Sequence, residues 1–160
     1  MLEPPVVDTS PLIYLARTQN IHLLRTVSST IVVPAPVRDE VRAKASDESA
    51  SILEKTPWLI HVAGSQVPAE ISRWDLGAGE SSVLAWAQAH AGSIAILDDG
   101  KGRRVAQELR LPLIGTLGIV LRAKRLGVIP LARPVVEDLI GSGMYLSAVL
   151  VREALALMGE

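Results

Sequence analysis

Short apolar runs rich in Val and Ile alternate along the chain with stretches whose apolar residues recur at helical spacing. Runs of this kind, bounded by polar and turn-forming residues, are typical of β-strands. Strands that alternate with helices form parallel β-α-β units. The pattern therefore predicts an α/β protein with five strands, at residues 5–8, 31–33, 58–62, 94–97 and 112–114.

Cap and turn residues indicate where the first helices begin. Ser10 followed by Pro11 is a suitable N-cap and first-turn pair. A further helical segment is predicted at residues 21–27. The segment 34–36, Pro-Ala-Pro, ends the second strand and starts a helix that carries Glu40.

The middle of the chain contains one helix whose carboxylate faces the core. Residues 45–55 are predicted to be a polar helix or a loop, and residues 64–79, rich in Gly, Ser and Pro, a long irregular segment. Glu80 then begins a helix whose apolar residues follow it by three, four and seven positions. Glu80 therefore shares the apolar stripe, and an acid on that side requires a partner.

Basic residues follow the fourth strand, and the chain ends in helices. A basic helix is predicted to end near residue 110. Thr116 is placed to cap a helix that stops at Gly127, and residues 135–140 and 147–158 form two more helices.

The composition fits one compact domain, residues 1–160, with a large core. An apolar fraction of 49% and a mean hydropathy of +0.33 favour a sheet covered on both faces or an oligomer with a hydrophobic seam. The longest uncharged stretch, residues 81–97, contains polar residues and cannot span a bilayer. With no cysteine and no leader-like N-terminus, we expect a cytoplasmic, soluble protein without disulfides or thiolate metal sites.

Charge is unevenly distributed along a chain whose net charge is −1. Residues 101–133 contain eight basic residues and a single acid, Glu108. This asymmetry can place a basic rim beside an acidic pocket, which suits a phosphate backbone. The alternative is an ordinary solvated helical face.

Acidic residues stand where strands end and helices begin. They are Asp8, Glu40, Glu80 and the pair Asp98 and Asp99. In α/β proteins these positions meet at one edge of the sheet, so a shared carboxylate cluster is expected. Two carboxylates about 5 Å apart repel by roughly 3 kcal/mol at an effective dielectric of 20, so the cluster requires a bound cation or raised pKa values.

Oxygen ligands of this kind favour Mg²⁺ or Mn²⁺. An ion held there can lower the pKa of a bound water, orient it for in-line attack on a phosphodiester, and neutralise charge in the transition state. That chemistry describes a nuclease. The alternative is coincidence, since 17 acids in 160 residues place some at strand ends inevitably.

Five ordered motifs resemble those of PilT N-terminus (PIN) domain nucleases, and the likeness spans nearly the whole chain. It is greatest for a branch similar to the toxins of virulence-associated toxin-antitoxin pairs. The motifs are Val7-Asp8-Thr9-Ser10, Pro36 with Arg38-Asp39-Glu40-Val41, Gly77-Ala78-Gly79-Glu80-Ser81, Leu97-Asp98-Asp99 and Gly115-Thr116-Leu117-Gly118, with Gly143 and Ser147 before a final helix.

The resemblance implies a three-layer α/β/α fold with a mainly parallel sheet. It also implies a Mg²⁺- or Mn²⁺-dependent endoribonuclease that leaves 5′-phosphate and 3′-hydroxyl ends. By position, Asp8, Glu40 and Glu80 are the metal-binding acids, and either Asp98 or Asp99 is the fourth. Glu80 departs from the Asp of many relatives and can reach the ion through a water.

The resemblance also suggests residues that contact substrate. Thr9 or Ser10 would bond a metal-bound water or the scissile phosphate, and Thr116 would do likewise from a helix N-terminus. Arg103 and Arg104 are candidate phosphate contacts. The ordinary alternative for the hydroxyls is helix capping. For the arginines it is a weak ion pair on the surface.

Three functions compete. The first is a ribonuclease, which the resemblance extends to a toxin that is neutralised by a small antitoxin protein and active as a homodimer. The second is a catalytically silent module that binds RNA or protein, which mutually repelling acids disfavour. The third is a small-molecule phosphohydrolase, which the basic segment disfavours. The three tryptophans are expected to pack in the core, because no aromatic stacking platform surrounds them.

Overall fold

The structure, a computed structural model, describes residues 2–160 and contains a five-stranded sheet in which every pairing is parallel. The strand order is β3-β2-β1-β4-β5. Val6 pairs with Val32 on one side and Ala95 on the other, so β1 lies at the centre. This confirms the five predicted strands. They are β1 (Val6–Val7), β2 (Ile31–Pro34), β3 (Leu59–Val62), β4 (Ala95–Ile96) and β5 (Leu113–Ile114).

Helices connect the strands and extend beyond the last of them. Between the strands lie α1 (Thr9–Arg17), the 3₁₀ helix η1 (Ile21–Thr26), α2 (Ala35–Lys44), α3 (Asp47–Glu54), α4 (Ala69–Ser72), α5 (Ala78–Ala89) and α6 (Gly100–Glu108). After β5 come α7 (Thr116–Arg125), α8 (Arg133–Gly141) and α9 (Ala148–Leu157).

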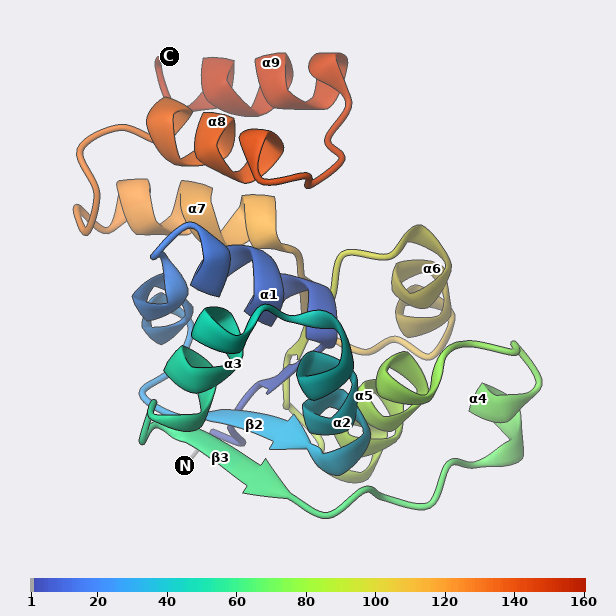
Figure 1. Cartoon of the computed structure of the whole chain (residues 1–160). Helices are drawn as coiled ribbons and strands as arrows, with labels where there is room; N and C mark the ends of the chain where they lie inside the picture. The colour runs from blue at the N-terminus through green and yellow to red at the C-terminus, as the bar shows by residue number, and fades with distance from the viewer. Residues whose placement is uncertain (1) are drawn as a thin grey trace.

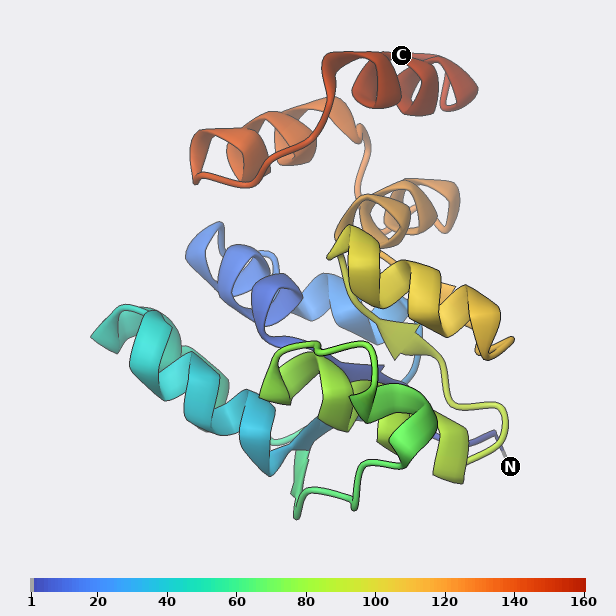
Figure 2. The ribbon, with the colours of Figure 1, turned by 90° about the vertical axis from the view of Figure 1, so that its right-hand side faces the viewer.

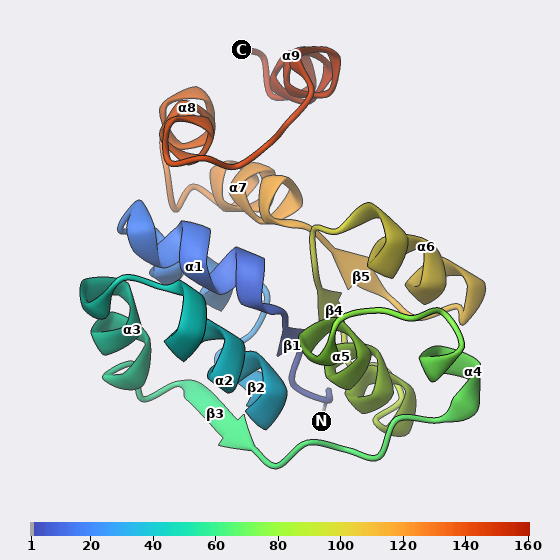
Figure 3. The ribbon, with the colours of Figure 1, turned by 45° about the vertical axis from the view of Figure 1, so that its right-hand side comes forward.

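The helices form two layers around the sheet, which confirms the α/β/α arrangement (Figures 1 and 3). Parallel crossovers are right-handed, so α1, which leads toward β2, and α5, which leads toward β4, lie on opposite faces. α5 packs on β1, β2 and β4, and α6 packs on β5. On the other side α1 packs against α3 and η1, and η1 packs against α7.

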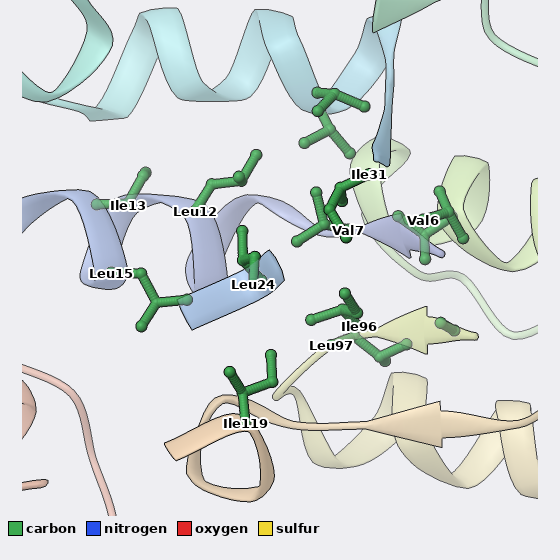
Figure 4. Packing of buried hydrophobic residues seen from close by; sticks show 14 of the residues in the cluster. Val6, Val7, Leu12, Ile13, Leu15, Leu24, Ile31, Ile96, Leu97 and Ile119 are labelled. Atoms are coloured by element: carbon green, nitrogen blue, oxygen red, sulfur yellow. The ribbon is translucent and has the colours of Figure 1, made fainter. Parts of the chain in front are cut away.

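The core lies where β1 and β4 meet the helices on either side. Val6, Val7 and Ile96 are fully buried at the centre of the sheet. Figure 4 shows Leu12 of α1 and Ile119 of α7 among the buried side chains around these strands. Because β1 and β4 are buried on both faces, their apolar runs show no alternation. The tryptophans Trp58, Trp74 and Trp86 pack against this core as expected.

Two helices begin at residues other than those predicted, for one physical reason. α1 begins at Thr9 with Asp8 in the N-cap position, so Ser10 is not its cap. α7 begins at Thr116 with Gly115 as its cap. The backbone turns into a helix immediately after each strand end, and the hydroxyl of Thr116 binds a distant carboxylate instead of its own helix. The segment 64–79 is also less irregular than predicted, because it contains α4 and the start of α5.

The last three helices stack away from the sheet, α7 innermost and α9 outermost (Figures 1 and 2). Glu160 links all three: its carboxylate accepts hydrogen bonds from Lys124 of α7 at 2.7 Å and from the backbone of Ala132 and Arg133 at the start of α8. The Lys124 hydrogen bond lowers the pKa of Glu160 to about 2. None of the helices described for residues 2–160 is long and apolar enough to cross a membrane.

Candidate functional site

Three of the predicted acids project from the ends of two adjacent parallel strands. Asp8 follows β1, and Asp98 and Asp99 follow β4 one residue after its end. The chain leaves β1 toward β2 on one side, whereas β4 lies on the other, so the strand order reverses between them. A reversal of this kind opens a crevice at the carboxyl ends of the strands, where α/β proteins bind ligands. Glu40 on α2 and Glu80 on α5 complete the group.

Asp8 is buried and only partly bonded. It is 5% exposed, and within the described chain its Oδ1 atom has no hydrogen-bond partner. Burial raises its pKa to about 6, against a backbone hydrogen bond from Thr9 that lowers it. The negative charges of Glu40, Asp98 and Asp99 raise it further. These carboxylates therefore lie close enough to repel one another.

Glu80 lies on the opposite side of the group. It belongs to the first turn of α5 and is half-buried, with Oε2 buried and without a hydrogen-bond partner in residues 2–160. Burial, then the charges of Asp99, Asp8 and Glu40 and a hydrogen bond with Asp99, raise its pKa to about 7. Two carboxylates share a hydrogen bond only when one of them is protonated.

Glu40 is held in place by two donors. The Thr9 hydroxyl donates to Oε2 at 2.8 Å, and the Gly79 backbone N–H donates to Oε1 at 2.9 Å. A Cβ atom at position 79 would lie only 2.8 Å from Oε2. Glycine at position 79 therefore allows this carboxylate to rest on the backbone of α5, which explains part of the Gly-Ala-Gly motif.

A second glycine allows the approach of Glu80. A Cβ atom at position 102, in α6, would lie 2.9 Å from Glu80 Oε2. Gly102 donates its backbone N–H to Asp99 Oδ2 at 3.0 Å, as does Lys101. The first turn of α6 thus brings Asp99 and Glu80 together.

Asp98 and Asp99 are bonded differently, although they are consecutive. Both oxygens of Asp98 accept hydrogen bonds from Thr116: the backbone N–H at 2.7 Å and the hydroxyl at 2.6 Å. Asp99 caps α6 through Oδ2 alone, is exposed, and interacts with Glu80. Asp98 therefore connects the end of β4 to the start of α7, whereas Asp99 keeps one oxygen for another partner.

A pocket of about 230 Å³ opens over the acids. Of the predicted substrate contacts, Ser10 is exposed and lines this pocket. Thr9 and Thr116 are buried and bonded to carboxylates. Arg103 donates to the Leu97 carbonyl at 3.0 Å, and Arg104 is exposed on α6. The pocket is lined by Asp8, Thr9, Ser10, Ile13, Tyr14, Arg17, Glu40, Lys44 and Glu80.

Three of these lining residues, Tyr14, Arg17 and Lys44, were not anticipated from the sequence. Tyr14 and Arg17 lie more than one turn into α1, and Lys44 is the last residue of α2. No motif marks them. The one sequence signal is the i, i+4 spacing of Glu40 and Lys44, which places Lys44 beside an acid. Lys44 Nζ lies 4.0 Å from Glu40 Oε2.

The oxygen atoms without partners fit a divalent cation. Asp8 Oδ1 and Glu80 Oε2 are the carboxylate oxygens among the buried atoms without hydrogen-bond partners in residues 2–160. In that part of the chain no three Asp, Glu or His residues stand close enough together to hold an ion jointly. Mg²⁺ commonly takes one or two carboxylates directly and completes its shell with water, so the donor set present fits such an ion.

We predict that the metal-free protein loses stability as pH rises from 4 to 7. Asp8 and Glu80 have folded pKa values above their unfolded values of 3.8 and 4.5, so their folded forms favour the proton. The two groups cost the fold no stability below about pH 4, where both are protonated, and cost it most above about pH 7, where both are ionised. Urea unfolding in EDTA should give a free energy about 2 kcal/mol lower at pH 8 than at pH 5, about half of what the two pKa shifts would give in full, because solvent screens the partly exposed Glu80. Equal or greater stability at pH 8 would contradict this.

The chain was compared with known proteins. A family model described as "DUF3368: PIN domain" matches residues 4–160, almost the full length. No curated protein matches the chain.

Proposed function

Since the chain belongs to the PIN domain family, a group of nuclease folds whose members generally use divalent metal ions and often bind RNA, we propose that it is a Mg²⁺- or Mn²⁺-dependent endoribonuclease. The observation that carries the proposal is the pair of buried carboxylate oxygens without partners, Asp8 Oδ1 and Glu80 Oε2. Each carboxyl has a raised pKa, so a positive charge placed between them would relieve the strain.

The residues around the pocket have distinct proposed roles. Asp8 and Glu80 would hold the ion directly and Asp99 through a water, with Glu40 kept in orientation by Thr9 and Gly79. When bound, the ion supplies an activated water and neutralises charge that develops on the phosphate. Asp98 does not bind the ion in this proposal, because Thr116 bonds both of its oxygens and ties the end of β4 to α7. Of the two aspartates after β4, we therefore propose Asp99 as the fourth acid of the site.

Substrate contacts are assigned by exposure. The exposed hydroxyl of Ser10 lies in the pocket and can donate to the scissile phosphate. Thr9 and Thr116 act instead through the carboxylates they bind. Arg104 is free to reach a phosphate from the surface of α6, whereas Arg103 is partly committed to the Leu97 carbonyl.

The test is cleavage of a single-stranded RNA by purified protein with Mn²⁺, with Mg²⁺ and with EDTA. We expect cutting with either ion, none in EDTA, recovery when Mn²⁺ is restored in excess, and products with 5′-phosphate ends. RNA binding without cutting under every condition would instead support the silent binding module. Cutting in EDTA would refute the metal-dependent mechanism.

We extend the proposal to a toxin that acts as a homodimer and is neutralised by a small antitoxin protein. The family resemblance supports it, and so do exposed apolar side chains at and before α9. These are Tyr145, Val149, Leu150 and Leu157. Light scattering at micromolar concentration should give twice the mass of 17.1 kDa, and a monomeric mass would refute the dimer.

A further inference from the structure

The rim of the carboxylate pocket carries two cations, and they differ in how far they are paired. Lys44 Nζ lies 4.0 Å from Glu40 Oε2, so its charge is partly matched by an acid of the site. Arg17, on α1, lines the same pocket but forms no salt bridge within residues 2–160. Arg17 is therefore the charge on the rim with capacity for an anion.

Arg17 is held in place by neutral groups. Its Nη1 atom donates to the Ser142 carbonyl at 2.7 Å, and its guanidinium carbon lies 5.4 Å from the centre of the Tyr14 ring. Tyr14 in turn donates its hydroxyl to the Gly143 carbonyl at 3.3 Å. One nitrogen and one face of the guanidinium are occupied, which leaves the remaining N–H donors and the full positive charge.

Two other arginines make a similar aromatic contact away from the pocket. Arg25 lies 5.8 Å from the Trp58 ring centre, and Arg73 lies 5.9 Å from the Trp74 ring centre. Neither lines the pocket over the acids. Stacking on a ring therefore does not distinguish Arg17 from the other two arginines. Its position in the pocket with Asp8, Glu40 and Glu80 does.

We propose that Arg17 binds a backbone phosphate of the RNA, next to the phosphate that is cut. A guanidinium matches phosphate oxygens through two parallel N–H donors, and a pre-oriented one loses less side-chain entropy on binding. An arginine at the rim also offsets the repulsion between the acids and the approaching polyanion. This rests on the proposed function, and it makes the loop between α8 and α9, which holds Arg17, part of substrate binding.

The test is the salt dependence of RNA binding, measured by anisotropy of a labelled single-stranded RNA in EDTA, where cutting is not expected. Each phosphate contact on a single strand contributes about 0.7 to the slope of log Kd against log salt. We expect Arg17→Gln to reduce that slope by about 0.7 and to raise Kd roughly fivefold at 50 mM salt. Arg17→Lys should keep the slope, because it keeps the charge.

Arg25→Gln is the matched control, since it removes the same charge from an exposed arginine that also stacks on a ring. Its curve should overlay the wild type. If Arg17→Gln lowers the melting temperature by more than about 5 °C, Arg17→Met replaces it, because Met keeps an apolar side chain of similar length beside the Tyr14 ring. An Arg17 variant without charge but with the wild-type slope overturns the proposal, and so does a wild type that binds no RNA.

Cleavage with Mn²⁺ is assayed separately, so the two proposals fail independently. Wild-type protein that binds RNA with the Arg17-dependent slope but does not cut it supports the role of Arg17 and refutes the ribonuclease. Protein that cuts RNA while the slope is independent of Arg17 gives the reverse result.

Discussion

Asp8→Asn should abolish RNA cleavage and at the same time make the metal-free protein more stable. Substitution of residues that hydrogen-bond to metal ligands already reduces metal affinity or activity about 10–100-fold. Loss of a ligand itself should therefore reduce activity by more than about 100-fold. The stability gain follows from burial. A pKa raised from 3.8 to about 6 means that the ionised Asp8 costs about 3 kcal/mol at pH 8.

The amide of the variant offsets part of that gain, because a buried group with an unmade hydrogen bond costs about 1–3 kcal/mol. We therefore expect a net gain of up to roughly 2 kcal/mol in EDTA at pH 8, or up to about 6 °C in melting temperature. Differential scanning calorimetry in EDTA measures this. With excess Mn²⁺ the order should reverse, because bound ion stabilises only the wild type.

Asp138→Asn is the matched control for Asp8→Asn, since Asp138 is exposed on α8 and remote from the pocket. It should leave both activity and melting temperature unchanged. An Asp8→Asn protein that is less stable than the wild type in EDTA would show that the buried carboxylate stabilises the fold. Unchanged cutting by Asp8→Asn would remove Asp8 from the chemistry.

Asp99→Asn and Asp98→Asn should separate metal binding from support of the fold. Asp99 keeps an oxygen free beside Glu80, so its substitution should weaken Mn²⁺ binding at least about tenfold, as expected for a group that supports the direct ligands. Asp98 has both oxygens bonded to Thr116, so its substitution should leave Mn²⁺ affinity within about threefold while lowering stability by about 1 kcal/mol. Calorimetric titration with Mn²⁺ and urea unfolding measure the two effects.

Thr116→Val completes the comparison, because it removes the hydroxyl that Asp98 accepts. The two substitutions act on one contact, so the double variant should lose less stability than the sum of the two single losses. Equal loss of Mn²⁺ binding in Asp98→Asn and Asp99→Asn would make both aspartates ligands.

The sequence was sufficient to predict the strands and the acids at their ends. The apolar runs that form β1 and β4 are buried on both faces, and the residue after a buried parallel strand faces the crevice. Glu80 was predictable for a related reason, because an acid on the apolar stripe of α5 must meet a partner. In each case a local pattern determines the environment of the side chain.

The sequence was insufficient where packing between distant elements determines the environment of a side chain. Asp98 and Asp99 are both acids at the end of β4, and only the approach of α7 shows that Thr116 occupies one of them. Thr116 looks like a helix cap because its own helix begins there, yet it is fully buried and bonded to another element. Arg17 reaches the pocket only because the loop after α8 folds back to hold it.

The central position of β4 has a consequence for the chain during its synthesis. β4 is inserted between β1 and β5, so until it emerges β1 has an unpaired edge. A ribosome that has produced everything through β3 has made Asp8 and Glu40 but neither Glu80 nor Asp99. The unfinished polypeptide therefore lacks half of the proposed catalytic acids, and the proposed ribonuclease would be inactive until α5 and α6 have been synthesised.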